Sequence, residues 1–135
     1  MKKIILVIAV LATIFCGGYY YTFVYSKNHH RDAQSEKAII ISADSLISAY
    51  QKNEQAANSL YLNKAVEVTG IIISINKDQA GHTTILLGNT ESFSNVSVTL
   101  LSTNAITKNI GELATVKGVC TGNLSDVIIN EGVLK

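Results

Sequence analysis

The stretch YLNKAVEVTGIIISINKD, residues Tyr61–Asp78, decides the fold of this 135-residue chain. Before Gly70 its apolar side chains, Val66 and Val68, occupy even positions and alternate with Glu67 and a threonine. After Gly70 the strongest apolar residues occupy odd positions: Ile71, Ile73 and Ile75. Because the side chains of a strand alternate between its two faces, a change of parity requires an extra residue or a sharp bend. We therefore predict one long strand whose phase slips at Gly70, as in a strand that serves two sheets of a small barrel.

Four further strands follow along the chain. They are indicated by alternating or β-branched apolar residues between turn signals, at residues 83–87, 95–100, 113–121 and 127–133. Residues 102–110 carry no strand period and are expected to form a turn or a short helix. Val116–Gly118 repeats the pattern of Val68–Gly70, so we expect both glycines to bend their strands at one corner. Five strands with an irregular link between the third and fourth predict a mainly β fold, a five-stranded Greek-key barrel of the OB-fold type.

One helix is expected before the barrel. Ser42 or Asp44 can cap it, and apolar residues follow at helical spacing. These residues are Leu46, Ile47, Tyr50, Ala57 and Leu60 or Tyr61. We predict a helix over about residues 43–59 that lies against the barrel or closes one of its ends. The apolar run at 38–41 is expected to be extended and to pack on the same surface.

The amino-terminal quarter differs in composition from the rest. Ile4–Val24 is a run of 21 residues without a charge, which is long enough to span a hydrocarbon core as a helix. An uncleaved signal anchor, a signal peptide cleaved after Gly18 and lipidation at Cys16 are the three alternatives. The residues before Gly18 and Cys16 match the small-residue cleavage patterns poorly, so the anchor is favoured. This divides the chain into a transmembrane anchor at 1–25, a polar tether at 26–37 and a helix-plus-barrel domain at 38–135.

A short pattern across the helix and the first strand resembles a known family. Asn53, Ala57, Tyr61 and Lys64 follow the order N-x3-A-x3-Y-x2-K, and V-x-V-x-G comes next at 66–70, with V-x-G at 116–118. In these motifs residues 44–134 resemble the tRNA_anti-like family. The family's usual glycine between the tyrosine and the lysine is absent, but Asn63 can take the left-handed turn conformation required there.

The resemblance implies a bacterial OB-fold protein behind an export signal or membrane anchor, and implies no particular activity. With Lys2 and Lys3 ahead of the apolar run, the charge balance places the amino terminus in the cytoplasm. We therefore expect a single-pass protein of the bacterial cytoplasmic membrane with its domain on the extracytoplasmic side.

No recognisable catalytic or cofactor motif occurs in the sequence. It has no glycine-rich phosphate loop, nucleophile elbow or cysteine–histidine metal spacing, so we predict no enzyme activity, no cofactor and no metal site. The adjacent His29 and His30 are interpreted as a solvated membrane flank. The candidate ligand-facing or motif residues are Asn53, Tyr61, Lys64 and His82. The structural alternatives are a tyrosine packed on the barrel, a lysine that holds a turn and a solvated histidine.

Charge and aromatic content argue against nucleic acid as the partner. Residues 33–135 carry seven lysines against nine carboxylates, a net of −2, and their aromatic residues are Tyr50, Tyr61 and Phe93. Proteins that bind single strands combine a basic groove with stacking rings. We therefore predict a membrane-tethered OB-fold interaction module for a protein, peptide or glycan, acting through the barrel face or the turns at 78–82 and 122–126. An oligonucleotide-binding OB-fold protein is the alternative.

Overall fold

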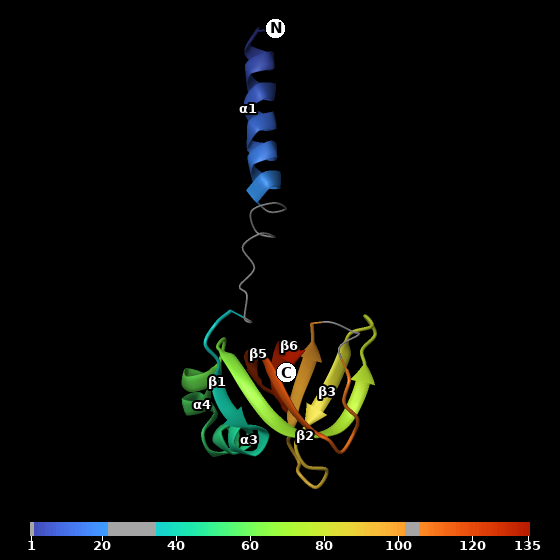
Figure 1. Ribbon diagram of the computed structural model, residues 1–135. Helices are drawn as coiled ribbons and strands as arrows, with labels where there is room; N and C mark the ends of the chain where they lie inside the picture. Colours follow the sequence, from blue (N-terminus) through green and yellow to red (C-terminus); the bar gives the residue numbers. More distant parts are fainter. Residues whose placement is uncertain (1, 22–34, 102–105) are drawn as a thin grey trace. The chain divides into compact units, whose positions relative to one another are not determined.

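The computed structural model describes residues 2–21, 35–101 and 106–135 (Figure 1). The chain divides into two compact units, Met1–Asp32 and Ala33–Lys135. The described part of the first unit is mainly the helix α1 (Lys2–Tyr19). Among the residues described, we find no helix with both the length and the apolar character that a membrane crossing needs. The transmembrane prediction for Ile4–Val24 is thus unsupported, and residues 22–24 and the histidine pair at 29–30 lie outside the described residues.

The second unit is a closed β-barrel. Its described residues form six strands: β1 (Ile39–Ser42), β2 (Ala65–Lys77), β3 (Thr83–Leu87), β4 (Val96–Leu100), β5 (Leu113–Asn123) and β6 (Val127–Leu134). The strand order is β1-β2-β3-β4-β6-β5, and β5 pairs in turn with β2, which closes five strands into a barrel (Figure 1). Only β4 and β6 pair in parallel within the barrel. The predicted mainly β, five-stranded barrel is confirmed.

The apolar run before the helix forms the strand β1, which lies outside the closed barrel. It pairs in parallel with β2, from Ile39 opposite Val66 to Ser42 opposite Thr69. The expected extended conformation is confirmed, and the run also contributes a sixth strand. The first half of β2 therefore has β1 on one side and β5 on the other, whereas its second half pairs with β3.

Two helices, rather than the single helix predicted over 43–59, connect β1 to β2. They are α3 (Ala43–Lys52) and α4 (Glu54–Tyr61). Asn53 separates them with an extended backbone, at φ −161° and ψ 97°. The Asn53 side chain accepts a hydrogen bond from the backbone N–H of Ala56 at 3.0 Å, while its own backbone N–H donates to Ala49. One asparagine thus ends α3 and caps α4, which explains the break.

The sequence predicts that the phase of β2 slips at Gly70. In the structure the slip occurs at Ile73. Val66, Val68 and Ile72 are all fully buried, so the inward positions remain even beyond Gly70. Opposite β3, Ile72 pairs with Leu87 and Ser74 pairs with Leu86, which leaves Ile73 as the extra residue of a bulge. Only after that bulge does an odd position pack on the core, at Ile75.

Close packing, and not a bend, explains the glycine at position 70. A β-carbon there would lie 2.8 Å from the β-carbon of Ala43 and 3.2 Å from that of Leu87. The start of α3 can approach β2 only because Gly70 has no side chain. The expectation that Gly70 and Gly118 share one corner is wrong, because Gly70 pairs with Ala114 and Gly118 pairs with Val66.

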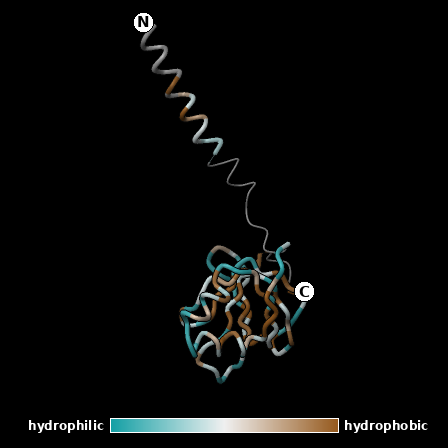
Figure 2. The backbone as a smooth tube through the Cα atoms, turned by 90° about the vertical axis from the view of Figure 1, so that its left-hand side faces the viewer, coloured by the Kyte–Doolittle hydropathy of each residue, from teal (hydrophilic) through white to brown (hydrophobic). Residues whose placement is uncertain are grey.

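The core fills the barrel and extends beneath the two helices. Figure 2 shows the hydrophobic residues of this unit concentrated along the strands. Leu46, Ile47 and Tyr50 bring the buried face of α3 into the same cluster as the strand residues. The Tyr50 hydroxyl lies 3.4 Å from the sulfur of Cys120, which is fully buried as expected. Burial, reinforced by this contact, raises the pKa of Tyr50 well above its usual value, so its hydroxyl stays protonated.

Candidate ligand-binding groove

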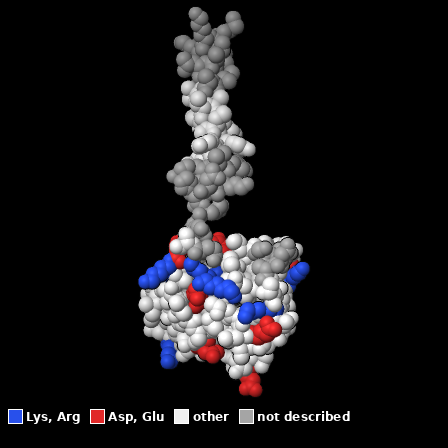
Figure 3. All heavy atoms as spheres, in the orientation of Figure 1, with Lys and Arg blue, Asp and Glu red and all other residues white. Residues whose placement is uncertain are grey.

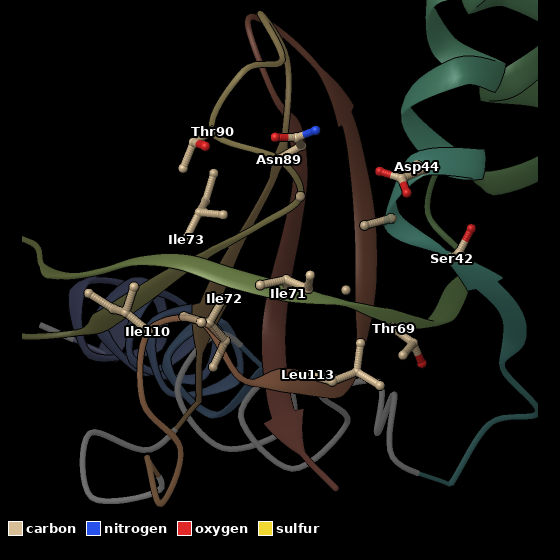
Figure 4. A pocket seen from close by; sticks show the side chains of 14 residues that line it. Ser42, Asp44, Thr69, Ile71, Ile72, Ile73, Asn89, Thr90, Ile110 and Leu113 are labelled. Atoms are coloured by element: carbon tan, nitrogen blue, oxygen red, sulfur yellow. The ribbon is translucent and has the colours of Figure 1, made fainter.

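A groove of about 650 Å³ opens on the outside of β2 where Gly70 and Ile71 leave the pairing with β1 (Figure 4). Four segments that are distant in sequence line it: residues 42–44, residues 69–73, residues 88–90, and residues 110, 111 and 113. They are the junction of β1 with α3, the middle of β2, the start of the β3–β4 loop and the residues that lead into β5. The groove therefore forms only when the barrel folds and brings these four segments together, and no local sequence motif contains it.

The floor of the groove is aliphatic and accessible. Ile71 is 48% exposed, Ile110 is 62% exposed and Leu113 is 61% exposed, and Ile73 adds a half-buried side chain. Ile71 and Leu113 are direct neighbours on paired strands. No aromatic ring occurs among the described residues that line the groove. Such a surface suits an aliphatic side chain better than a flat ring.

Polar groups form the rim above that floor. Figure 4 shows the side chains of Asp44 and Asn89 facing each other across the mouth of the groove, with Thr90 beside Asn89. The Asn89 carbonyl accepts a hydrogen bond from the backbone N–H of Glu91 at 3.0 Å. Neither the Asp44 carboxylate nor the Asn89 amide nitrogen has a side-chain partner within the part of the chain that the structure describes. These two groups are available to a ligand.

Asn95 fixes the wall that carries Asn89. Its side-chain carbonyl accepts from the backbone N–H of Asn89 at 3.1 Å, and its own backbone N–H donates to the Asp126 carboxylate at 2.7 Å. Gly88 has a φ of +149°, and a β-carbon there would lie 2.2 Å from the Asn95 carbonyl oxygen. Gly88 also donates to the carbonyl of Ile71 at 3.0 Å, which ties this wall directly to the floor.

A turn at 109–112 fixes the opposite wall. Gly111 donates to the carbonyl of Ile72 at 2.7 Å, and Ile72 donates to the carbonyl of Glu112 at 3.0 Å. The Glu112 carboxylate accepts from both the side chain and the backbone N–H of Asn109. These hydrogen bonds lower the pKa of Glu112 below its usual 4.5, so the carboxylate is ionised and the turn intact at neutral pH. The contacts weaken only as the pH falls through that lowered value.

None of the four residues singled out from the sequence lines the groove. Asn53 is the shared helix cap, and Tyr61 packs against the core with its ring 6.4 Å from that of Tyr50. Lys64 donates to the carbonyl of Ser59 at 2.9 Å, and His82 contacts Asp78 within its turn, through its backbone N–H at 2.8 Å and its ring at 3.1 Å. These contacts stabilise the fold, and a role of the four residues in ligand binding stays a prediction.

The turn that contains Lys64 has the backbone expected for it. Asn63 adopts a φ of 57°, so the predicted left-handed conformation is confirmed. Its backbone N–H donates to the carbonyl of Cys120 at 2.8 Å, which joins the end of α4 to β5.

The groove residues that sequence reasoning missed are Asp44, Ile71, Asn89, Ile110 and Leu113. Of these, only Ile71 carries a signal in the sequence, since it is strongly apolar and follows Gly70, but that pattern predicts a place in the core.

Basic side chains of the barrel unit are largely engaged in local contacts. Of its seven lysines, four have an acceptor: Lys135 pairs with Glu67, Lys117 binds the carbonyl of Glu36, Lys64 that of Ser59 and Lys108 that of Leu113. Basic and acidic side chains are interspersed on the face in Figure 3. Phe93, fully exposed in the β3–β4 loop, lies outside the groove. The described surface thus shows neither a basic groove nor a row of stacking rings.

Comparisons with known proteins agree with this fold. A family model described as tRNA_anti-like matches residues 1–131. Among solved structures, a Klebsiella pneumoniae protein described as a "putative nucleic acid-binding lipoprotein" is similar at a TM-score of 0.58 and 18% identity, over 71% of this chain and 92% of that one. At that identity the likeness shows the fold alone. No curated protein matches the sequence. The predicted exclusion of nucleic acid therefore stays a prediction.

Proposed function

Because this chain belongs to the tRNA_anti-like family, whose model matches residues 1–131, we propose that it is an OB-fold module that binds an extended peptide segment of a partner protein. The observation that carries this proposal is the groove, with its exposed aliphatic floor and polar rim. Peptide recognition combines pockets for apolar side chains with hydrogen bonds to the backbone, and the groove offers both. The module is proposed to be non-enzymatic, since the sequence carries no recognisable catalytic motif.

Peptide is preferred to glycan and to nucleic acid because of what lines the groove. Sugar rings and nucleobases bind well on aromatic side chains, whereas the described lining is aliphatic. A phosphate backbone would also meet the Asp44 carboxylate at the rim. An oligonucleotide remains the second candidate on account of the fold, which elsewhere binds oligonucleotides across its strands and turns. That function would use a surface other than the groove.

The groove proposal is tested with the full-length chain in mild detergent. The probes are blocked, fluorescently labelled hexapeptides with one leucine or isoleucine at a central position and varied neighbours. We expect binding by fluorescence anisotropy at micromolar concentration, and we expect Ile71→Asp to weaken it about tenfold because the change places a carboxylate on the apolar floor. Phe93→Asp, a similar change at an exposed apolar residue outside the groove, is the control and is expected to leave binding unchanged.

Two results would contradict the peptide proposal. One is the absence of binding by any peptide of the set, and the other is equal weakening by Ile71→Asp and Phe93→Asp. A labelled single-stranded oligonucleotide, titrated in parallel at low salt, tests the second candidate. Binding that falls steeply with added salt would favour the oligonucleotide function.

We further propose that the amino-terminal segment remains on the mature protein and tethers the barrel on the extracytoplasmic side of the membrane. The support for this comes from the sequence: the uncharged run from Ile4 and the poor cleavage patterns at Gly18 and Cys16. Mass spectrometry of the protein isolated from membranes is expected to find an intact amino terminus. A mature chain that begins near Tyr19, or at a lipidated Cys16, would disprove the uncleaved tether.

A further inference from the structure

We infer that the groove recognises a segment in which a basic side chain accompanies the aliphatic anchor, and that Asp44 is the residue that selects it. This inference rests on the proposed function and specifies its ligand. It follows from the charge of the groove, the position of Asp44 and the absence of a partner for its carboxylate among the described residues.

Asp44 is the one charged residue among the described residues that line the groove. The other rim groups are neutral: the hydroxyls of Ser42, Thr69 and Thr90 and the amide of Asn89. Two of these hydroxyls already have partners, since Ser42 caps α3 through Ser45 and Thr69 bonds Thr115 at 2.8 Å. Asp44 is therefore the one charged side chain in the described lining, and it has no partner among the described residues. A ligand cation beside the aliphatic anchor complements it, whereas a phosphate or carboxylate is repelled.

The position of Asp44 allows it to act on a bound segment. The side chain is exposed, and it faces Asn89 across the mouth, with Ile71 on β2 beneath them in the view of Figure 4. An aliphatic side chain seated on Ile71 would therefore place its neighbouring residues at the rim. The amide nitrogen of Asn89 is available and can donate a hydrogen bond to a backbone carbonyl of the same segment.

A purely structural role for Asp44 makes a different prediction. An acidic residue in the first turn of a helix interacts favourably with the helix dipole, and Asp44 occupies that turn in α3. Glu54 occupies the equivalent turn of α4 and does not line the groove. If both carboxylates act only on their helices, neutralising either one changes stability and leaves ligand preference untouched. Glu54→Gln is therefore the matched control for Asp44→Asn.

The experiment compares three hexapeptides that share a central leucine and carry lysine, glutamine or glutamate at one flanking position, with both flanks sampled. Their affinities are measured for the full-length protein in mild detergent. We expect lysine to be preferred to glutamine about threefold, in the range of an exposed ion pair, with glutamate the weakest. The preference should shrink as salt is raised from about 50 mM to about 500 mM because exposed charges are screened.

The variants decide the role of Asp44. In Asp44→Asn the lysine and glutamine peptides should bind equally, and in Asp44→Lys the glutamate peptide should become the tightest, while Glu54→Gln keeps the lysine preference. Circular dichroism confirms that each variant is folded. If the peptides bind without regard to charge, or if the lysine preference survives in both Asp44 variants, this inference is wrong and the groove proposal stands. If none of the peptides binds, both are overturned.

Discussion

Replacing Gly70 by valine is expected to destabilise the barrel by about 2–3 kcal/mol, although valine normally favours strands. The reason is steric. An added β-carbon lies 2.8 Å from the β-carbon of Ala43, and two further methyl groups enlarge the conflict with the start of α3. Either α3 moves away from β2 or β2 leaves its pairing with β5. Urea denaturation of the full-length chain, followed by circular dichroism, measures the loss.

Thr69→Val, one residue earlier, is the control for this change. Because valine favours strands, this change would by itself be neutral or slightly stabilising. The structure adds the hydrogen bond between the hydroxyls of Thr69 and Thr115, at 2.8 Å, so a loss of about 1 kcal/mol is now expected. If Gly70→Val costs no more than Thr69→Val, the contact with Ala43 does not limit the packing of α3.

The second large effect is expected at Ile72. Its side chain is fully buried where β2 changes partners, so Ile72→Ala should leave a cavity and cost about 3–4 kcal/mol. The adjacent Ile71→Ala removes the same atoms from a side chain that is 48% exposed. It should cost less than about 1 kcal/mol and mainly weaken ligand binding. Thermal and urea melts of the two variants give the comparison.

This pair of variants also locates the phase slip of β2. With the bulge at Ile73, as the register shows, the even residue is the costly one. The opposite order, with Ile71→Ala the more destabilising, would place the slip at Gly70 and remove Ile71 from the groove floor. The fold and the candidate site are thus tested by the same measurement.

Strand content was predictable because it depends on local periodicity. The segments that became β2 to β6 all show alternating or β-branched residues between turn signals, and each was found within a few residues of its true bounds. The left-handed turn at Asn63 was predictable for a similar reason, since asparagine tolerates that backbone conformation. Closure of the barrel followed from the number of strands and the irregular link before β5.

The phase slip was misplaced because an apolar side chain was assumed to be buried. Ile71 is strongly apolar and follows Gly70, so parity counting assigned it to the core, while the structure exposes it on the groove floor. The pattern rule therefore failed at the candidate site, where exposed apolar residues are expected. Sequence periodicity does not distinguish an isoleucine buried in the core from one exposed on the floor of a groove.

The break between α3 and α4 and the groove itself depend on contacts that periodicity does not reveal. Asn53 lies within the single helix predicted over 43–59, and its capping of a second helix depends on a hydrogen bond that its side chain accepts from the backbone N–H of Ala56. Ser42 and Asp44 are both candidate caps in the sequence, and the structure gives this role to Ser42. The groove unites four separated segments, so no single stretch of sequence could indicate it.

The position of β1 determines how the barrel would respond to mechanical tension. Any pull on the chain ahead of residue 35 reaches the barrel through β1, whose four residues pair in parallel with β2. The Lys117 side chain holds the carbonyl of Glu36 at 2.6 Å, just before that strand. A force directed along β1 loads these contacts together in shear instead of opening them one at a time. The β1–β2 pairing and the Lys117 contact must therefore yield before a pull on the leading segment can extend the chain that follows β1.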